Sequence, residues 1–518
     1  MKSILTTSLL LSSILATSVQ AASLTLGIAA EQPSMDPHYS RTSPNQATAS
    51  QFFERLVRYD QDMRMQPHLA ESWRQLDLLT WEIKLRQGVK FSDGSDFDAA
   101  DVVYTVKRIP QVQNSPASFD SDVAKIISIE AKDAHTLVIK LSEASPRFIK
   151  EIGNLYILPS ELALDVSSDD FNNGPAMIGT GPYQFVEWRR GEFVKAVRNP
   201  HYWGKQPHFD EVTFRFITNG ASRVASLLSG SVDMIEDIPT QDLPNLQSKA
   251  ELQVWQKASA RLIYLHMDSN REQTPFITAK DGSAINNPLR DARVRQALSL
   301  LIDRQAISER IMRGAAEPTG QFVPAGLEGF IDNFPVPQAN VEQAKALLAE
   351  AGYGDGFKMV LHSSNNRYQN DAQVIQAVAQ LLSRGGLEVA VEVMPANVYF
   401  KRASALDFSM FLMGFGSSTG SSLRGLNQVL HSYDKDLGHG LFNRGRYSNS
   451  EFDRVIESAE QEADPAQHEE LLQLATQVAM EDYGILPLYF EKQTWAARQG
   501  LIFETGRQEA TLAADIRQ

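Results

Sequence analysis

Cysteine is absent from the 518-residue chain. Its absence excludes a disulfide framework and zinc-thiolate sites, and it excludes lipid attachment through a cysteine behind a cleaved leader. Long hydrophobic runs are also missing. The apolar stretch from Ile4 to Ala16 is too short and too diluted with hydroxyl residues to span a bilayer, and no later stretch reaches that length.

The first residues resemble a secretory leader instead. Lys2 supplies the positive end, residues 4–16 the apolar segment, and Val19-Gln-Ala21 the small residues that precede a cleavage site. We predict a signal peptide over residues 1–21, with cleavage after Ala21 and Ala22 as the nearby alternative. A leader without a lipid-anchoring cysteine predicts release into the periplasm. The competing interpretation of this stretch is a buried N-terminal helix.

The chain carries an excess of acidic residues, with 63 Asp and Glu against 49 Lys and Arg, and a net charge of −14. Such a surface argues against nucleic acids and anionic membranes as partners. The length is too great for one ordinary core and predicts two or three domains. Short strand patterns alternate with helical patterns throughout, which favours an α/β fold. Strands are expected at residues 136–141, 261–267 and 485–490, and helices at residues 47–57, 99–108 and 294–311.

Catalytic motifs are not found. The sequence has no G-x-S-x-G elbow, no H-E-x-x-H helix and no phosphate-binding loop with its lysine. The run Gly416-Ser-Ser-Thr-Gly420 superficially resembles a nucleophile loop. An exported serine hydrolase built on it would need a base that the sequence does not show, so we predict no enzyme activity and a loop that faces a cleft.

Metal-binding patterns are equally weak. The ten histidines are scattered, and His431 and His439 flank a polar loop. Exposed or hydrogen-bonded histidines are the favoured interpretation, while a site built from separated histidines stays open. The cluster from Asp93 to Asp101 fits no calcium-loop spacing, and turn and capping roles explain Asp93 and Asp98. We therefore predict no metal and no cofactor.

Several segments together resemble one family. Leu85-Arg-Gln-Gly-Val-Lys-Phe-Ser-Asp-Gly94 opens the series, and the others are Gly179-Thr-Gly-Pro-Tyr-Gln-Phe185, Asn199-Pro-His-Tyr-Trp-Gly204, Leu228-Ser-Gly-Ser-Val-Asp233, Val294-Arg-Gln-Ala-Leu298 and the helix end at Ala344 to Tyr353. This ordered set is similar to the oligopeptide, dipeptide and nickel-type periplasmic substrate-binding proteins of ABC importers, which form solute-binding protein family 5. The resemblance covers nearly the whole chain after the leader.

The resemblance implies a two-lobed periplasmic-binding-protein clamp of type II-like α/β fold, with an extra α/β domain inserted in the first lobe. It places lobe I at residues 22–60, 177–267 and 487–518, the extra domain at 61–176, and lobe II at 268–486. Residues 261–267 and 485–490 would be the hinge crossings. The implied mechanism is capture of a solute between the lobes by differential binding to the closed form, which then docks on the permease.

The resemblance also implies where the ligand lies. Family members often hold a peptide ammonium with an aspartate after a Gly-Trp pair, but here Phe415 stands for the tryptophan and hydroxyl residues follow it. A buried ammonium without a carboxylate would be poorly compensated, so a modified or cyclic peptide, an opine, a sugar conjugate or a metal chelate becomes an alternative to a simple peptide. The predicted ligand-binding residues are Tyr39, Ser40, Arg41, Tyr264, Arg367, Phe415, Ser417, Ser418, Thr419, Arg444, Arg446 and Tyr489.

The side-chain chemistry of the arginines and tyrosines in this set explains how they could contact a ligand. Arg367, Arg444 and Arg446 could donate in pairs to a ligand carboxylate, while Tyr264 and Tyr489 could line the cleft from the hinge strands. The expected partners are a small-molecule or short-peptide ligand and an ABC permease with its ATPase. We expect a monomer that binds no nucleic acid. A receptor that presents its solute to a membrane sensor is the remaining alternative.

Overall fold

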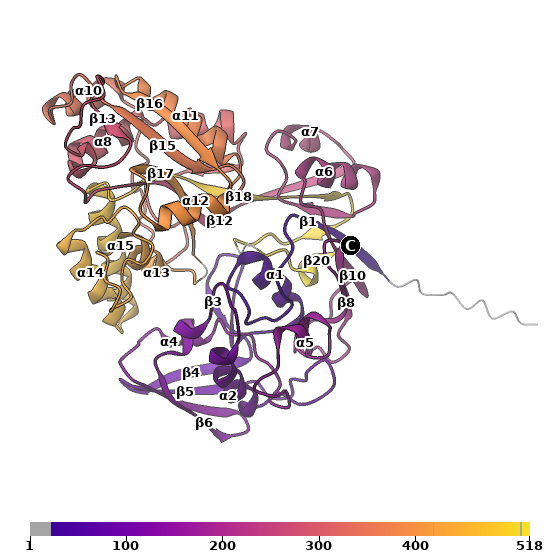
Figure 1. The fold of residues 1–518 in the computed structure, drawn as a ribbon. Coiled ribbons are helices and arrows are strands. Elements are labelled where there is room, and N and C mark those ends of the chain that lie inside the picture. The colour runs from indigo at the N-terminus through magenta and orange to yellow at the C-terminus, as the bar shows by residue number, and fades with distance from the viewer. Residues whose placement is uncertain (1–21, 418, 508–509) are drawn as a thin grey trace, which may run out of the picture.

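The computed structural model describes residues 22–417, 419–507 and 510–518. The predicted signal peptide at residues 1–21 and the predicted site residue Ser418 therefore lie outside the described residues. Two long strands connect the two halves of the molecule, β12 (Leu252–Met267) and β18 (Leu486–Arg498). They pair antiparallel from Leu252 opposite Arg498 to Leu265 opposite Leu486, with a register shift between Ala258 and Leu262 (Figure 1).

Lobe I is built around one end of this strand pair. Strand β1 (Ser23–Ile28) runs parallel to β10 (Glu211–Phe216) and to β11 (Met234–Glu236), and β11 pairs with β18. The remaining elements of lobe I are α1 (Ser43–Phe52), β8 (Tyr183–Arg189), β9 (Phe193–Arg198), α6 (Gly220–Ser229), α7 (Leu243–Gln247), β19 (Ile502–Phe503) and β20 (Ile516–Arg517).

The extra domain is the part of the chain between α1 and β8. Its sheet has the order β4 (Ala70–Asp77), β5 (Thr80–Leu85), β7 (Thr136–Leu141), β6 (Ile126–Asp133). Helix α2 (Ala99–Arg108) begins at the predicted cap Asp98, whose side chain accepts from the backbone of Ala100 while Asp101 closes the capping box. The other elements are β2 (Val57–Tyr59), β3 (Met65–Pro67), α3 (Asp120–Val123), α4 (Phe148–Ile152) and α5 (Ser168–Asn172).

Lobe II surrounds the other end of the strand pair. Its part of the large sheet runs β13 (Ile277–Thr278), β15 (Lys358–Ser364), β17 (Met410–Gly416), β12, β18. The other elements are α8 (Ala292–Leu301), α9 (Arg304–Ala306), β14 (Ala316–Pro318), α10 (Val341–Glu350), α11 (Asp371–Ser383), β16 (Glu388–Met394), α12 (Ala396–Ser404), α13 (Leu423–Leu430), α14 (Ser450–Gln461) and α15 (Pro465–Glu481).

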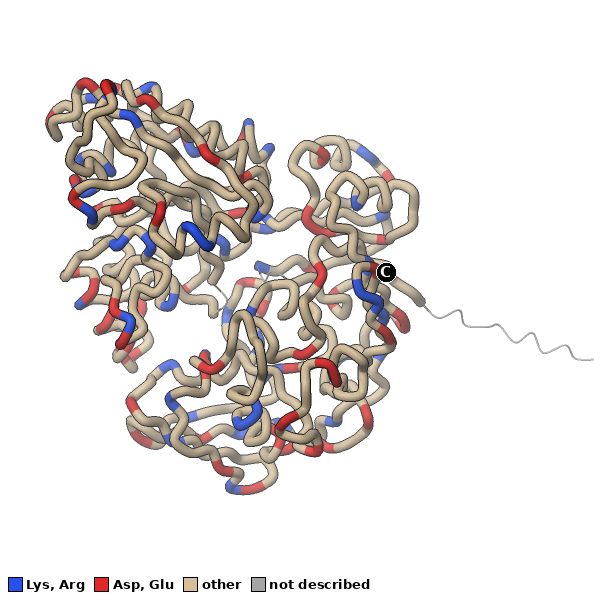
Figure 2. Tube along the Cα trace, in the orientation of Figure 1, with Lys and Arg blue, Asp and Glu red and all other residues tan. Residues whose placement is uncertain are grey.

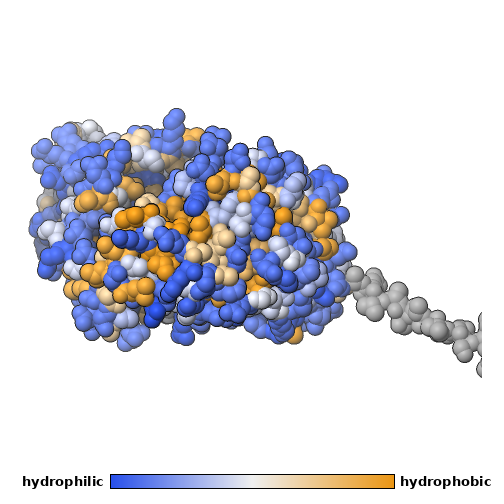
Figure 3. All heavy atoms as spheres, turned by 90° about the horizontal axis from the view of Figure 1, so that it is seen from below, coloured by the Kyte–Doolittle hydropathy of each residue, from blue (hydrophilic) through white to orange (hydrophobic). Residues whose placement is uncertain are grey.

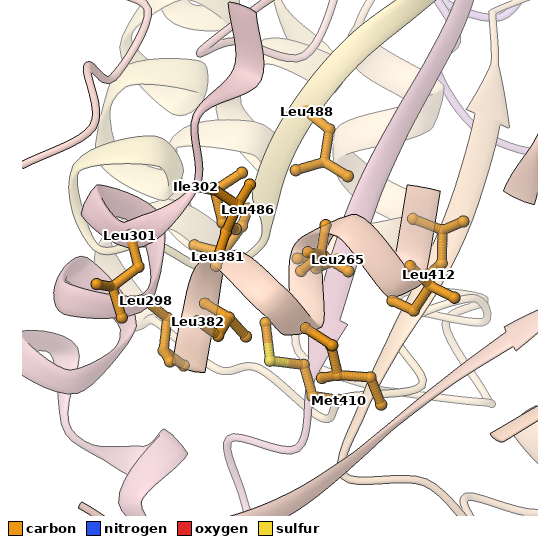
Figure 4. Packing of buried hydrophobic residues seen from close by; sticks show 14 of the residues in the cluster. Leu265, Leu298, Leu301, Ile302, Leu381, Leu382, Met410, Leu412, Leu486 and Leu488 are labelled. Carbon is orange, nitrogen blue, oxygen red and sulfur yellow. The ribbon is translucent and has the colours of Figure 1, made fainter. Parts of the chain in front are cut away.

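The core of lobe II explains why the crossing strands are so apolar at this end. Leu265, Leu412 and Leu486 from three neighbouring strands pack with Leu298 and Leu382 from helices α8 and α11 (Figure 4). All five side chains are fully buried. Burial of a leucine side chain of this kind contributes roughly 1.5–3 kcal/mol, so the strand pair is anchored firmly in lobe II.

One predicted helix is broken in the structure. Residues 294–311 form α8, an extended break at Ile302 and Asp303, the short α9, and a π-helical turn at Ile307–Ile311. The side chain of Asp303 accepts from the backbone of Ala306 and so restarts the helix. Arg304 turns inward, where its Nε donates to the Pro487 carbonyl at 2.7 Å. A local polar cap and a buried arginine thus overcome the apolar helical spacing.

Two other element boundaries differ from prediction. Helix α1 ends at Phe52 rather than near residue 57, because Phe53 is already extended and leads into β2. Strand β12 begins at Leu252, well before residue 261. The domain boundaries drawn from the resemblance stay a prediction. None of the helices in the described residues is long and apolar enough to cross a membrane. On the face seen in Figure 3, hydrophobic residues gather toward the middle among hydrophilic ones.

Candidate ligand-binding site between the lobes

The two lobes touch beside the crossing strands. Gln369 of lobe II donates from Nε2 to Asp237 Oδ1 of lobe I at 2.9 Å, and Asn370 Nδ2 donates to Thr240 Oγ1 at 2.6 Å. The backbone amide of Gln369 also donates to Glu491 on β18 at 3.1 Å. The loop that carries the predicted site residue Arg367 is therefore held against both the crossing strands and lobe I.

Arg367 itself is exposed. Its guanidinium lies 5.1 Å from the centre of the Tyr368 ring, and its backbone amide donates to Asp371 Oδ2. Tyr368 is in turn tied to the end of β17, since its hydroxyl accepts from the Gly414 amide at 2.9 Å. Within the described residues Arg367 has no carboxylate within salt-bridge distance, so its charge is available to a ligand.

The end of β17 and the loop after it carry the predicted site residues Phe415, Ser417 and Thr419. The half-buried Phe415 ring packs against Phe322 and Phe442, at centroid distances of 6.0 and 6.4 Å. Ser417 Oγ donates to the Ser421 carbonyl at 2.8 Å. Its proton is thus given to the loop's own backbone and not to a histidine or carboxylate. Thr419 is half-buried, and Ser418 cannot be placed because it lies outside the described residues.

The lobe I loop with Tyr39, Ser40 and Arg41 lies against the extra domain. The Tyr39 carbonyl accepts from Ser115 Oγ at 2.7 Å, and Ser40 is buried in a bridge with Ala117. Arg41 Nε donates to the Ser118 carbonyl at 2.7 Å, and its Nη2 pairs with Asp122. The Arg41 guanidinium also lies 4.5 Å from the centre of the Phe119 ring. Residues 115–122 of the extra domain therefore hold this loop in place, and Arg41 is its charged residue.

The charges of Arg41, Arg55 and Arg424 influence one another, and they come from both lobes. Burial lowers the pKa of Arg41, Asp122 opposes that shift, and the positive charges of Arg424 and Arg55 add to it. Burial likewise raises the pKa of Asp122 against the attraction of Arg41, Arg424 and Arg55. Arg41 and Arg55 belong to lobe I, whereas Arg424 lies on α13 of lobe II. Asp122 is the carboxylate that the structure places in a salt bridge with this group.

A second charged contact joins the rims of the lobes. Lys150 Nζ of α4 lies 2.5 Å from Glu328 Oε2 of lobe II. Burial lowers the pKa of Lys150, and Glu328 opposes that shift. Burial would raise the pKa of Glu328, but attraction by Lys150 and Arg147 outweighs it and lowers the pKa. Figure 2 shows charges of both signs along the facing edges of α4 and of the α13–α15 region.

The contacts of four predicted residues lie mainly within lobe II. Tyr489 is fully buried in the core of lobe II, and Tyr264 is fully buried in a second cluster that also contains Tyr59 and Met63 of the facing half. Burial raises the pKa of both hydroxyls. Arg444 donates to Ser404 Oγ at 3.3 Å, within lobe II. Arg446 donates to the Asn443 carbonyl and lies 3.7 Å from the centre of the Tyr433 ring. None of the four contacts lobe I through a hydrogen bond or salt bridge of the described residues.

Two pockets of the described structure lie outside the interlobe region. One of about 410 Å³ is lined by Tyr39, Arg108 and Arg190 among others, and another of about 350 Å³ lies within lobe II beside Phe334 and Tyr483. Neither is lined by both lobes. We place the candidate site instead where charged groups of both lobes act on one another, because a solute captured between lobes must contact both.

Sequence reasoning missed Arg55, Arg424, Lys150 and Glu328. No local motif marks them, because the charged groups that face them across the lobes come close only when the two lobes meet. Arg55 Nη2 donates to Gln46 Oε1 at 2.8 Å and to the Tyr156 hydroxyl at 2.6 Å, both within the first 160 residues. Its relation to Arg424 depends on the arrangement of the lobes alone.

Comparison with known proteins agrees with this architecture. The model of the bacterial extracellular solute-binding proteins, family 5 Middle, matches residues 64–436. The glutathione-binding protein GsiB of Salmonella paratyphi A is 30% identical over 475 residues, covering 90% of this chain and 88% of the relative. HbpA2 from Haemophilus parasuis superposes with a TM-score of 0.79 at 22% identity, covering 95% of this chain and 99% of that one.

The unliganded open form of the periplasmic murein tripeptide binding protein MppA superposes with a TM-score of 0.78 at 23% identity, covering 96% and 97% of the two chains. The two-lobed α/β fold expected from the sequence is thereby confirmed. The family consists of binding proteins and not of enzymes. The chain belongs to family 5 of the bacterial extracellular solute-binding proteins, the periplasmic receptors of ABC importers.

Proposed function

We propose that this protein captures a peptide-like solute with at least one carboxylate and delivers it to an ABC permease. The leader is removed after Ala21 and leaves a periplasmic protein without a lipid anchor, which acts as a monomer without a cofactor and without enzyme activity. The observation that supports a carboxylate on the ligand is the group of Arg41, Arg55 and Arg424, in which Arg41 is the arginine with a salt bridge among the described residues, to Asp122.

One of these three arginines has a carboxylate partner in a salt bridge among the described residues, although Arg424 also attracts the charge of the half-buried Glu151. Arg41 pairs with Asp122, but Arg55 bonds to neutral partners, and Arg424 is exposed with no salt bridge to a described residue. Positive charges held close together in a partly dry place cost free energy. A ligand carboxylate would lower that cost, and a guanidinium can bind it through two parallel hydrogen bonds.

The structure offers fewer groups that could bind the ammonium end of a peptide than groups that could bind its carboxylate. The Ser417 hydroxyl donates to its own loop, and no aspartate stands in the stretch from Gly416 to Gly420. Peptides with a modified or shielded amine therefore suit the site better than simple dipeptides. Glutathione is the first compound to test, because the GsiB relatives bind it and because it carries two carboxylates. Opines, sugar conjugates and metal chelates are the alternatives.

Native mass spectrometry of the purified full chain tests the proposal directly. A co-purified ligand should appear as a mass difference that mild denaturation removes, and its identity should include a carboxylate. Isothermal titration calorimetry then compares the affinities of the ligand classes, with glutathione, oxidised glutathione, dipeptides, an opine, a glycopeptide and Ni(II)-histidine as ligands. A neutral or cationic ligand would overturn the carboxylate proposal, and the absence of binding to every class would overturn solute capture itself.

A further inference from the structure

A compact group of metal-ligating side chains lies on lobe II away from the three arginines. His431 follows α13, His439 ends the next turn, and Glu457 lies on the facing helix α14. One ligand atom from each of the three residues lies within 4.8 Å of the others, and the two imidazole rings have their centres 4.2 Å apart. Glu460, one helical turn beyond Glu457, has Oε2 3.8 Å from His439 Nε2.

The hydrogen bonds of His431 leave one ring nitrogen facing a carboxylate. Its Nδ1 lies 2.9 Å from the Ser432 carbonyl, which can only accept, so Nδ1 carries the proton. Nε2 then directs its lone pair at Glu457 Oε1, 3.2 Å away. Two acceptors at this distance repel each other unless a cation lies between them, which is either a second proton on the ring or a metal ion.

His439 adds the observation that favours the metal ion. Its Nδ1 is buried and has no hydrogen-bond partner among the described residues. A buried ring nitrogen without a partner costs free energy, and a proton on His431 would do nothing for it. A metal ion bound by both rings would satisfy the lone pairs of the two histidines together.

We propose that His431, His439 and Glu457 bind one divalent transition-metal ion of the Zn²⁺ class. Two imidazole nitrogens and one carboxylate oxygen are a donor set that such ions take, and they exclude the hard ions Mg²⁺ and Ca²⁺, which prefer oxygen alone. The Ser432 carbonyl orients the ring of His431 in the way that outer partners of metal ligands do. A water would complete the coordination.

A metal ion can reach this site from solvent, and its binding would affect the neighbouring structure. The Glu457 side chain is 48% exposed and that of His431 is 5% exposed, so an ion reaches the carboxylate first and the buried ring second. Binding would fasten residues 431–439 to α14. The segment that follows carries Phe442, which packs on Phe415 at the end of β17, so the metal would stiffen the packing beside the candidate ligand-binding loop.

Titration of the metal-stripped, untagged full chain with ZnCl₂ tests the proposal. One equivalent of Zn²⁺ should bind and raise the melting temperature, and X-ray absorption should show nitrogen and oxygen ligands without sulfur. The variants Glu457→Gln and His439→Gln should weaken binding by at least about tenfold, since even outer partners of metal ligands are worth roughly 10–100-fold. Glu457→Gln is at a half-exposed position and should fold whatever the fate of the histidine variant.

The matched control is His208→Gln, an exposed histidine of lobe I, which should bind Zn²⁺ like the wild type. Equal affinity in wild type and in both site variants would overturn the proposal and assign the ion to adventitious surface sites. Failure of the wild type to bind Zn²⁺, Ni²⁺ or Cu²⁺ at a concentration of about 100 µM would also overturn it, and would assign the Glu457 contact to a protonated His431.

Discussion

Lys150 Nζ and Glu328 Oε2 lie 2.5 Å apart although the two residues are separated by 178 positions and belong to facing lobes. Glu328 is at the same time fixed to the candidate ligand loop, because its amide donates to the Gly420 carbonyl and its carbonyl accepts from the Ser422 amide. The ion pair thus connects α4 of the extra domain to the loop that follows β17, and it should favour the closed arrangement of the lobes.

Loss of this ion pair should open the molecule. The Lys150 side chain is 13% exposed and that of Glu328 is 37% exposed, so solvent screens the pair in part. A pair of this kind contributes about 1 kcal/mol, or roughly fivefold in an equilibrium constant. Lys150→Ala should enlarge the radius of gyration in X-ray scattering and weaken ligand binding by about that factor. Lys140→Ala, an exposed lysine of the same domain, should do neither.

Gly420 allows the facing domain to approach closely because it has no side chain. Its φ angle is +66°, and a Cβ atom there would overlap the Met63 carbonyl of the facing domain. Gly420→Ala should therefore hold the lobes apart and weaken ligand binding, with a larger radius of gyration in the presence of ligand. Gly88→Ala separates this effect from backbone strain, because Gly88 has a φ of +74° and no atom within 4 Å of a Cβ. Equal scattering curves for the two variants would refute the steric explanation.

Arg424 and Arg367, two arginines without a salt bridge to a described residue, should differ in their importance for ligand binding. Arg424 faces Arg41 and Asp122 from the opposite lobe, whereas Arg367 lies beside the crossing strands on Tyr368. A charge-assisted hydrogen bond is worth about 1.5–3 kcal/mol, so Arg424→Ala should weaken binding of a carboxylate ligand by roughly tenfold or more. Calorimetry on Arg424→Ala and Arg367→Ala, each with Arg384→Ala as a control, would show which arginine holds the carboxylate. Unchanged affinity in either variant removes that arginine from the site.

Local features of this fold could be predicted from sequence. Asp98 begins α2 because its carboxylate caps the backbone amides that follow it, and that chemistry depends on adjacent residues only. Gly230 ends α6 in the left-handed conformation for the same kind of reason. The apolar run from residue 261 to 267 is strand because it lies between two other strands in a buried sheet.

The candidate site could be predicted only in part. The resemblance indicates the loop after β17 and Arg41 as ligand-binding. In the structure that loop is hydrogen-bonded to Glu328, which pairs with Lys150 of the facing domain, and the positive charge of Arg424 acts on Arg41. Tyr264 and Tyr489 lie on the crossing strands, where aromatic residues can line a cleft, but both side chains are buried in hydrophobic clusters. Arg424 and Glu328 have no signal in sequence, because their neighbours are set by how two separately folded lobes meet.

A buried histidine should make the stability of lobe I depend on pH. His38 is 1% exposed, its Nε2 lies 2.8 Å from the Tyr156 carbonyl, and its Nδ1 lies 2.9 Å from Arg108 Nη1. Because Arg108 can only donate, Nδ1 accepts and the ring is neutral. Burial, with the charge of Arg108 adding to it and Asp36 opposing, lowers the pKa of His38 to about 4. The unfolded chain, with an ordinary pKa near 6.5, therefore takes up a proton first as the pH falls.

The difference between the pKa of His38 in the folded and in the unfolded chain determines how the free energy of unfolding changes with pH. The contribution of His38 is fully present above pH 6.5 and is lost between pH 6.5 and about 4, by at most about 1.4 kcal/mol per pH unit. His38→Gln can still donate to Tyr156 and accept from Arg108, but it cannot titrate. Urea unfolding at pH 7, 5.5 and 4.5 should therefore show the stability advantage of the wild type over His38→Gln shrinking as the solution becomes acidic. A constant difference across this range would show that His38 is not neutral in the folded protein, and His208→Gln should leave the pH dependence of the wild type unchanged.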